Sequence, residues 1–328
     1  MSAILEGKPD KNLILVTGRT HPKLASDVAE QLGIDILETT AYDFANGEMY
    51  VRYTESVRGA DVFLVQSVCS GAGYDVNDAL MELLIMVDAA KRASARSVSA
   101  VVAHYGYARQ DRKAAPREPI TAKLVADLLE VSGIDNIITV DLHQDAIQGF
   151  FDIPVDNLLG NPIFTHHFHD RFVGQEETTV VVSPDVGSVS RARAFAQKLG
   201  MPLAIVDKRR QKANSSEVMN IIGDVRGKQV ILFDDMVDTA GSLCGAAQAL
   251  VEIGGATDVY ACASHGVLSG PAIERIENSS IKEMVFLDTV PPRPGVTCSK
   301  IKYLSVADIF AEAIERIYQE VSVSKLFN

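Results

Sequence analysis

The sequence lacks the features that mark secreted, membrane-spanning and zinc-binding proteins. Its first residues, MSAILEGKPDK, contain no apolar core of a signal peptide, and no apolar run approaches the length of a membrane span. The 328 residues include four cysteines, none of which forms a CxxC pair or matches a zinc pattern. We therefore expect a cytoplasmic protein that keeps its cysteines reduced and binds no membrane.

The chain also lacks an excess of positive charge, because 31 lysines and arginines face 43 aspartates and glutamates, a formal net charge of −12. A general nucleic-acid-binding protein is usually basic, so nucleic acid is not an expected partner. The composition, 47% hydrophobic and 23% charged, is that of a globular protein with enough material for two cores. An acidic enzyme with local basic pockets for anionic substrates fits these numbers better.

A Walker-type ATP loop is missing as well. The nearest approach, GDVRGKQ at 223–229, has too few residues between its glycines and no serine or threonine after its lysine. If the protein binds ATP, it must do so through another arrangement.

Apolar segments that alternate with amphipathic ones predict a parallel α/β architecture. Strands are expected over 13–17, 36–39, 61–66, 98–103, 135–140, 178–183, 203–207, 229–233, 257–263 and 283–287. Helices are expected over 22–32, 77–93, 121–131, 161–172, 189–199, 271–277 and 306–319, with a further helix after 242. The second half repeats the plan of the first, which predicts two related domains, 1–159 and 160–328.

The segment VILFDDMVDTAGS at 230–242 carries the strongest functional signal. Its apolar start is typical of a strand buried on both faces, and the residues after it predict a helix. Asp234, Asp235 and a small polar run, 238–242, stand between the two. The N-terminus of a helix can bind phosphate, whereas carboxylates suit sugar hydroxyls or a metal ion. The alternative is a surface turn that caps a helix.

Other predicted strands also end in polar clusters. Asp141 and His143 follow one strand, and Asp185 follows another. Ligands of open α/β sheets bind at the carboxyl ends of the strands, so these ends predict a site. Asp185 and His143 are candidate Mg²⁺ ligands, with a helix cap and a buried histidine as the alternatives.

Two basic clusters complete the pattern. One is KRRQK at 208–212, and the other lies in the long loop HYGYARQDRKAAPREP at 104–119, where two tyrosines suggest a nearby base. Both could be solvated basic turns. In an acidic chain, clamps for anionic substrates are the better interpretation.

Taken together, these strings resemble one enzyme family. YARQD at 107–111, VDLH at 140–143, QGFFD at 148–152, SPD at 183–185, Lys208-x-Arg210 and the segment 230–242 are similar to those of ribose-phosphate diphosphokinases, also called phosphoribosyl pyrophosphate synthetases. The resemblance runs from about Leu13 to Phe327. Phosphoribosyltransferases share the segment 230–242, whereas the RQD and DLH strings are much more specific to the synthetase.

The resemblance implies two phosphoribosyltransferase-like α/β domains, each a mainly parallel sheet flanked by helices, with the closing helix 306–319 packed back on the N-terminal domain. It implies the phosphate-dependent type of the family, which transfers the β,γ-diphosphoryl group of Mg²⁺–ATP to the 1-hydroxyl of ribose 5-phosphate. The products, 5-phosphoribosyl 1-diphosphate and AMP, would serve nucleotide, histidine and tryptophan biosynthesis. A homo-oligomer, commonly a hexamer built of dimers, is implied as well.

The resemblance also implies residue roles, with Lys208 and Arg210 as the catalytic pair. The implied ATP-binding residues are Phe44, Asn46, Gly47, Glu48, Arg109, Gln110, Asp111 and His143. The implied ribose 5-phosphate-binding residues are Arg210, Asp234, Asp235, Asp238, Thr239, Ala240, Gly241 and Ser242. His143 and Asp185 would serve Mg²⁺, and the loop around Phe44 would reach the ATP site of a neighbouring subunit. No residue is assigned as the general base.

The chain departs from the commonest family pattern at a few positions. Asn46 stands where many members have aspartate, Ser242 where many have threonine, and Ser188 where a glycine is common. The run AAP at 114–116 replaces more polar or basic residues in a loop that contributes to the allosteric site of other members. Activation by phosphate and inhibition by ADP therefore do not follow from the resemblance.

Three rival functions stay open at this point. A phosphoribosyltransferase would need no ATP site, which would leave Arg109 and His143 without a purpose. A non-catalytic regulatory partner of the synthetase is disfavoured by the presence of Lys208 and Arg210. A nucleic-acid-binding protein is disfavoured by the acidic balance.

Overall fold

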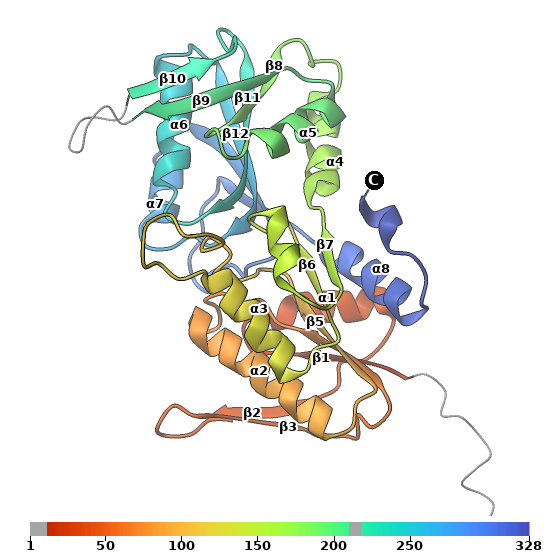
Figure 1. The fold of residues 1–328 in the computed structure, drawn as a ribbon. Helices are drawn as coiled ribbons and strands as arrows, with labels where there is room; N and C mark the ends of the chain where they lie inside the picture. The colour runs from red at the N-terminus through yellow and green to blue at the C-terminus, as the bar shows by residue number, and fades with distance from the viewer. Residues whose placement is uncertain (1–11, 210–217, 328) are drawn as a thin grey trace, which may run out of the picture. The chain divides into compact units, whose positions relative to one another are not determined.

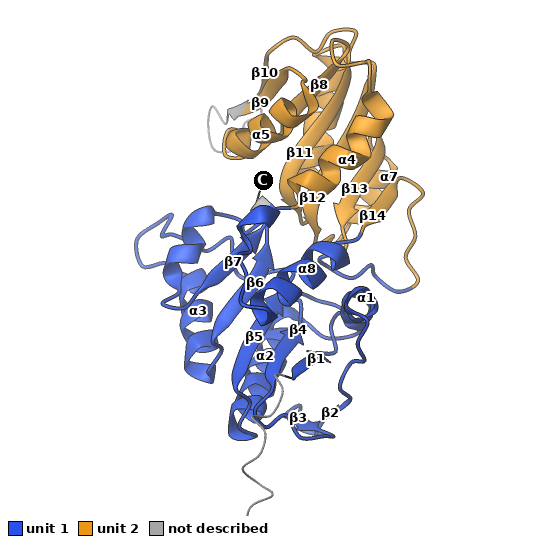
Figure 2. Ribbon diagram, turned by 90° about the vertical axis from the view of Figure 1, so that its right-hand side faces the viewer, with its two compact units in different colours: residues 1–159, 289–294, 305–328 blue, residues 160–288, 295–304 orange. Residues whose placement is uncertain are grey.

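The structure, a computed structural model, describes residues 12–209 and 218–327, and for Lys208, Arg209, Val218 and Phe327 it describes the backbone alone. The chain forms two compact units (Figure 2): unit 1 comprises Met1–Leu159, Thr289–Pro294 and Ser305–Asn328, and unit 2 comprises Gly160–Asp288 and Gly295–Leu304. Of the predicted catalytic pair, Arg210 lies outside the described residues. None of the helices that are described has the length and apolar character needed to cross a bilayer.

Unit 1 is built on a parallel sheet of five strands in the order β1-β4-β5-β6-β7. The strands are β1 (Leu13–Thr17), β4 (Asp61–Val65), β5 (Ser97–Val102), β6 (Asn136–Val140) and β7 (Val155–Leu158). The central strands are apolar runs buried on both faces, as expected of a parallel sheet covered by helices.

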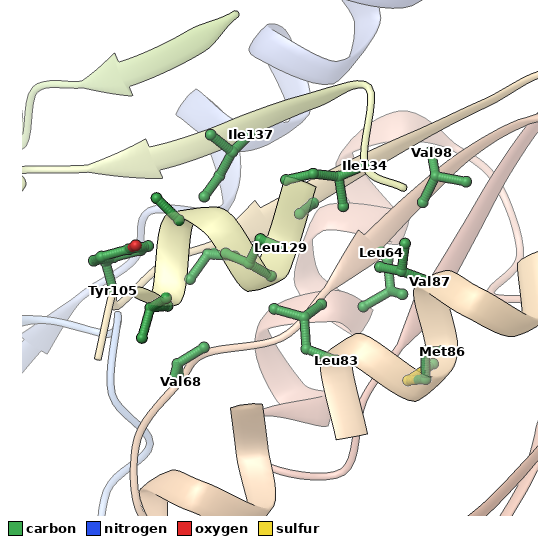
Figure 3. Packing of buried hydrophobic residues seen from close by; sticks show 14 of the residues in the cluster. Leu64, Val68, Leu83, Met86, Val87, Val98, Tyr105, Leu129, Ile134 and Ile137 are labelled. Carbon is green, nitrogen blue, oxygen red and sulfur yellow. The ribbon is translucent and has the colours of Figure 1, made fainter. Parts of the chain in front are cut away.

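Helices cover both faces of this sheet. They are α1 (Pro22–Leu32), α2 (Val76–Arg92), α3 (Thr121–Ser132) and α8 (Ala307–Tyr318). α2 packs against α3, and α1 packs against α8 on the opposite side of the sheet (Figure 2). Figure 3 shows the core beneath α2 and α3, where Leu83 and Val87 lie near Leu64 and Leu129. The closing helix, α8, is thus a part of unit 1.

A separate hairpin in unit 1 was not predicted. The sequence suggested a short strand at 36–39 and a polar loop from 42 onward, but β2 (Thr39–Asp43) and β3 (Met49–Tyr53) form an antiparallel pair. Ile36 makes only an isolated bridge with Leu15. The hairpin escaped prediction because both of its strands are partly exposed, so no apolar run marks them.

Unit 2 contains a seven-stranded sheet in the order β10-β9-β8-β11-β12-β13-β14, in which only β10 runs antiparallel to its neighbour. The strands are β8 (Thr179–Ser183), β9 (Leu203–Arg209), β10 (Val218–Ile222), β11 (Gln229–Val237), β12 (Asp258–Gly266), β13 (Ile281–Leu287) and β14 (Ile301–Leu304). The helices are α4 (Asn161–Phe172), α5 (Val189–Leu199), α6 (Gly241–Glu252) and α7 (Ala272–Glu277), as Figure 1 labels them. The predicted α/β class with mainly parallel sheets is confirmed.

One boundary in unit 2 corrects the sequence analysis. The central strand was expected to end at Phe233, with Asp234 opening a loop, but β11 continues to Val237. Asp234 pairs with Ala263 and Met236 pairs with His265 of β12, which is equally long. The ladder with β12 carries the strand past the end of its apolar run, so the two acids stand within a strand.

Candidate functional site

The candidate phosphate-binding loop of unit 2 is the junction between β11 and α6. The chain leaves β11 at Val237 and enters α6 at Gly241. Ala240, the residue before the helix, has φ +59°, a left-handed backbone that L-residues rarely adopt. This turn places Thr239 and Ala240 against the first turn of α6, where backbone N–H groups and the helix dipole favour an anion.

Two residues that follow β12 in the sequence donate hydrogen bonds to carbonyl oxygens of this loop. Arg275, in α7, donates from Nη1 to the carbonyl oxygen of Thr239 at 2.9 Å. The backbone N–H of Ser269 donates to the carbonyl oxygen of Asp238 at 2.8 Å. A Cβ atom at Gly241 would lie 3.2 Å from Arg275 Nη1, so a small residue is favoured there. Sequence reasoning missed Arg275, because nothing in its local sequence points to a loop some 36 residues earlier.

The two acids of β11 are engaged by α5. Asp234 Oδ1 accepts hydrogen bonds from Ser188 Oγ and from the N–H of Asp235, both at 2.9 Å. Arg191 Nη1 lies 3.3 Å from Asp235 Oδ2. Ser188 and Arg191 stand at the start of α5, so β11 and α5 together fix the orientation of the carboxylates.

The environment of Asp234 changes its acidity. Burial, together with the negative charges of Asp235 and Asp185, raises the pKa of Asp234 to about 7, although the Ser188 hydrogen bond opposes the shift. A carboxyl group with this pKa gains or loses a proton near neutral pH.

Asp185 shapes the turn between β8 and α5. Its Oδ1 accepts a hydrogen bond from the N–H of Ser188 at 2.9 Å, and its carbonyl oxygen accepts one from Ser183 Oγ at 2.7 Å. Asp185 thus shapes the turn ahead of α5 and does not cap the helix, because the N-cap residue is Ser188 and its side chain makes no capping hydrogen bond. Its carboxylate is exposed and acts on the pKa of Asp234, so the two acids also lie at the same edge of the unit 2 sheet.

The strand that carries Lys208 reaches the same edge. β9 runs parallel to β8, with Ile205 opposite Ser183. Lys208 comes after this pair along β9 and lies opposite Met219 of β10. The end of β9 therefore projects beyond β8 on the side where Asp185 follows β8.

In unit 1, the long loop after β5 is fastened to α3 through Gln110. The carbonyl oxygen of Gln110 accepts from the N–H of Ala122 at 3.1 Å, and its side-chain Oε1 accepts from Thr121 Oγ1. Tyr105 donates from its hydroxyl to the carbonyl oxygen of Ala122 at 2.9 Å. The N–H of Gln110 bonds the carbonyl oxygen of Tyr107, whose φ is +66°. Arg109 is exposed and Asp111 is partly buried on this tightly turned segment.

A second strand end in unit 1 carries His143. Asp141 has φ +44° and donates its N–H to the carbonyl oxygen of Leu158 at 3.0 Å, so the chain turns sharply after β6. The N–H of Leu142 donates to Asn157 Oδ1 at 3.1 Å. His143 is partly buried just beyond this turn.

The tip of the β2–β3 hairpin presents an aromatic ring. The N–H of Phe44 bonds the carbonyl oxygen of Glu48 at 2.7 Å, and the N–H of Gly47 bonds that of Phe44 at 2.8 Å. Asn46 Oδ1 accepts from the N–H of Glu48 at 3.2 Å, and Gly47 has φ +87°, so both residues shape the turn. Phe44 is 47% exposed, which leaves its ring available to a flat ligand.

The metal ligands suggested by the sequence lie in different units, His143 in unit 1 and Asp185 in unit 2. Among residues 12–209 and 218–327, no group of three or more histidine, cysteine or acidic side chains could hold a metal ion. Mg²⁺ prefers oxygen ligands such as carboxylates. The exposed carboxylate of Asp185 offers oxygen atoms of this kind.

Comparison with known proteins covers nearly the whole chain. Residues 13–133 match the family model of the N-terminal domain of ribose phosphate pyrophosphokinase, and residues 210–328 match that of the phosphoribosyl synthetase-associated domain. The chain is 58% identical over 316 residues to a ribose-phosphate pyrophosphokinase of Caldanaerobacter subterraneus subsp. tengcongensis, which covers 96% of this chain and 98% of the relative. It is 54% identical over 331 residues to the enzyme of that name from Bifidobacterium longum, covering 100% of this chain and 96% of the relative.

A solved structure agrees with the fold. The phosphoribosylpyrophosphate synthetase from Mycobacterium smegmatis superposes with a TM-score of 0.88 at 45% sequence identity. The match covers 94% of this chain and 100% of that one.

Proposed function

The chain belongs to the ribose-phosphate pyrophosphokinase family, and on that premise we propose that it makes 5-phosphoribosyl 1-diphosphate and AMP from ATP and ribose 5-phosphate. In this reaction the 1-hydroxyl of the sugar attacks the β-phosphorus of ATP in line, and AMP leaves. The observation that carries the proposal is the junction of β11 and α6, where a turn into the N-terminus of a helix follows two carboxylates.

Ribose 5-phosphate is assigned to unit 2. Residues 238–242 take the 5-phosphate, because the left-handed turn at Ala240 aims the chain into the first turn of α6. Asp234 and Asp235 take the ribose hydroxyls, since carboxylates accept hydrogen bonds from hydroxyls and repel phosphates. Ser188 and Arg191 hold the two acids in place from α5.

ATP is assigned to residues of unit 1. Arg109, Gln110, Asp111 and His143 stand on the two turns that follow β5 and β6, and the hydrogen bonds of Gln110 to the start of α3 fix the first of these turns. Phe44, Asn46, Gly47 and Glu48 would complete the ATP site of a neighbouring subunit, with the exposed Phe44 ring against adenine. This arrangement requires a homo-oligomer, for which a hexamer of dimers is our expectation.

Catalysis is assigned to positioning and to cationic stabilisation. Lys208 and Arg210 would contact the transferring diphosphoryl group as charge redistributes over its oxygens. Asp185 and His143 would serve Mg²⁺, which when bound would supply positive charge that offsets the charge of the phosphates. Asp234 and Asp235 orient the sugar so that its 1-hydroxyl faces the phosphorus.

The experiment that tests the proposal identifies the nucleotide released. Purified protein is incubated with Mg²⁺, ATP and ribose 5-phosphate, and the products are separated by chromatography. Release of AMP together with 5-phosphoribosyl 1-diphosphate is the expected result. Release of ADP would identify an ordinary kinase, and consumption of added 5-phosphoribosyl 1-diphosphate with a free base would identify a transferase.

A further inference from the structure

The β2–β3 hairpin is anchored firmly at its base. Near the end of β3, Tyr53 donates from its hydroxyl to the carbonyl oxygen of Met86 in α2 at 2.8 Å. The N–H and hydroxyl of Thr54 both donate to the carbonyl oxygen of Glu38, at 3.2 and 2.7 Å. The two strands form a sheet of their own (Figure 1), and a two-stranded sheet is marginally stable by itself. The tip, residues 43–49, therefore needs its own support.

That support comes from Arg19, which follows β1 in the sequence. Arg19 Nη2 lies 2.8 Å from Oδ1 of Asp43, the residue just before Phe44. Its Nε lies 2.5 Å from Glu82 Oε1 in α2. Its Nη1 donates to the hydroxyl of Tyr74 at 2.8 Å, and the guanidinium lies 4.3 Å above the centre of the Tyr74 ring. One side chain thus joins the tip of the hairpin to three other segments of unit 1.

Arg19 is itself fixed by a buried polar network. Glu82, which is 1% exposed, accepts from the N–H of Arg19 at 3.0 Å and from Gln66 Nε2 at 2.7 Å. Gln66 Oε1 in turn accepts from Thr20 Oγ1 at 2.6 Å. A Cβ atom at Gly18 would lie 2.3 Å from Gln66 Oε1, so the backbone approaches this network as closely as a glycine allows. Partial burial lowers the pKa of Arg19, but its hydrogen bonds to Asp43 and Glu82 outweigh that effect and raise it, so the guanidinium stays charged.

We propose that Arg19 is a positioning residue for the hairpin tip: its ion pair with Asp43 fixes the direction in which the Phe44 ring is presented to ATP. The inference rests on the proposed role of the Phe44 loop. The pair between Arg19 and Asp43 is partly exposed, with side chains 18% and 38% exposed, so it contributes little to stability. Its effect falls on how well ordered the tip is, where the rings of Phe44 and Tyr42 also contact each other within the hairpin.

The test uses Asp43 and not Arg19, because removal of Arg19 would leave the buried Glu82 carboxylate without its cation and would destabilise the fold. Asp43→Asn removes only the charge at the tip. Asp27→Asn is the matched control, because Asp27 forms a similar exposed pair with Lys23, at 2.7 Å within α1. Asp43→Glu, which keeps the charge, should restore most of the wild-type behaviour.

The first measurement reports on the tip directly. The sequence contains no tryptophan, so Phe44→Trp places a single tryptophan on the tip, where the native residue is already about half exposed. Time-resolved anisotropy of this protein should show slow decay with the whole molecule. Adding Asp43→Asn should introduce a fast nanosecond component of large amplitude, as loop motion does. Adding Asp27→Asn should not.

The second measurement is made with Phe44 intact and separates a positioning role from a structural one. Asp43→Asn should raise KM for ATP roughly three- to tenfold, as expected if the tip is correctly placed for a third to a tenth of the time. KM for ribose 5-phosphate and the melting temperature should stay as in Asp27→Asn. Unchanged anisotropy in the Asp43→Asn protein would overturn the role of Arg19. A new fast component with unchanged KM for ATP would instead overturn the assignment of the Phe44 loop to the ATP site.

Discussion

The two units hold their proposed substrates with different kinds of structure. In unit 2 the ribose 5-phosphate residues stand where a buried central strand meets a helix, and regular hydrogen bonding fixes most of the backbone. In unit 1 the proposed ATP residues stand on a hairpin tip and on the turns after β5 and β6, and side chains such as Arg19 and Thr121 fix the tip and the first of these turns. The placement of the unit 2 residues therefore depends mainly on the backbone hydrogen bonds of a strand and a helix. The placement of the unit 1 residues depends more on a few side-chain contacts, each of which one substitution can remove.

The largest effect should come from Lys208, on β9 of unit 2. Lys208→Ala should lower kcat roughly 10³–10⁵-fold with little change in either KM, because a cation that acts on the transferring group mainly in the transition state does not tighten ground-state binding. Arg209→Ala is the matched control and should have the smaller effect. Steady-state kinetics on proteins shown to be folded by circular dichroism would decide, and a kcat within about tenfold of wild type would remove Lys208 from catalysis.

Asp234→Asn should separate the two substrates. The loss of a charged hydrogen-bond acceptor should weaken ribose 5-phosphate by about 1.5–3 kcal/mol, or roughly 10- to 150-fold, and leave ATP nearly unaffected. Isothermal titration with each substrate measures this. An equal loss of affinity for both would contradict the assignment of this carboxylate to the sugar.

The same substitution should change the dependence of stability on pH. The pKa of Asp234 is about 7 in the folded protein and near 4 in an unfolded chain, so between these values the folded state holds a proton that the unfolded state has lost. This group therefore makes folding less favourable as pH rises from about 4 to 7, and the penalty is fully present above pH 7. Asp234→Asn should gain about 1–3 kcal/mol over wild type at pH 8 and almost nothing at pH 4, as measured by urea unfolding. A gain of the same size at both pH values would exclude titration of Asp234 as its cause.

A smaller effect should follow from Arg275→Met, which removes the hydrogen bond to the carbonyl oxygen of Thr239. Because Arg275 is exposed, we expect KM for ribose 5-phosphate to rise only about 3- to 10-fold, with kcat and KM for ATP close to wild type. Glu274→Gln, at the adjacent exposed position, is the control. If both variants behave alike, Arg275 does not support the loop.

The smallest effect is expected from a substitution in unit 1 that tests the assignment of the loop after β5 to ATP. Thr121→Val removes the hydroxyl that donates to Gln110 Oε1 and should raise KM for ATP about 2- to 5-fold, the scale of one neutral hydrogen bond. Thr165→Val is the matched control, because Thr165 donates to Asn161 Oδ1 at 3.0 Å within α4 of unit 2. A change in KM for ribose 5-phosphate in place of ATP would show that this loop does not serve the ATP site.

Much of this architecture was predictable from the sequence because the central strands are buried on both faces and read as apolar runs. The strands that went unpredicted, β7, β10 and β14, all lie at sheet edges, and β2 and β3 form an isolated pair. An edge strand has one neighbour and more exposure, so its sequence, as in VDNL of β7, mixes polar with apolar residues. The family resemblance is confirmed by the matching family models and by the similar relatives and solved structure.

The supporting residues could not be predicted, because they act over long distances in the sequence. Arg19 reaches Glu82 across 63 positions and Arg275 reaches Thr239 across 36. Each is an ordinary basic residue in its local context, and only the fold gives it a partner. The roles of the residues that would touch substrate stay predictions, to be tested by the variants described above.

The return of the chain from unit 2 to unit 1 bears on how the protein is made. Residues 289–294 and 305–328 belong to unit 1, and Val306, Phe310 and Ile314 of this part are fully buried. During synthesis the part of unit 1 up to residue 159 leaves the ribosome before α8, whereas unit 2 is complete once residue 304 has emerged. The second unit can therefore finish folding before the first. A chain released before α8 is made would have a complete unit 2 but an incomplete unit 1. Its α1 would lack the helix that packs against it.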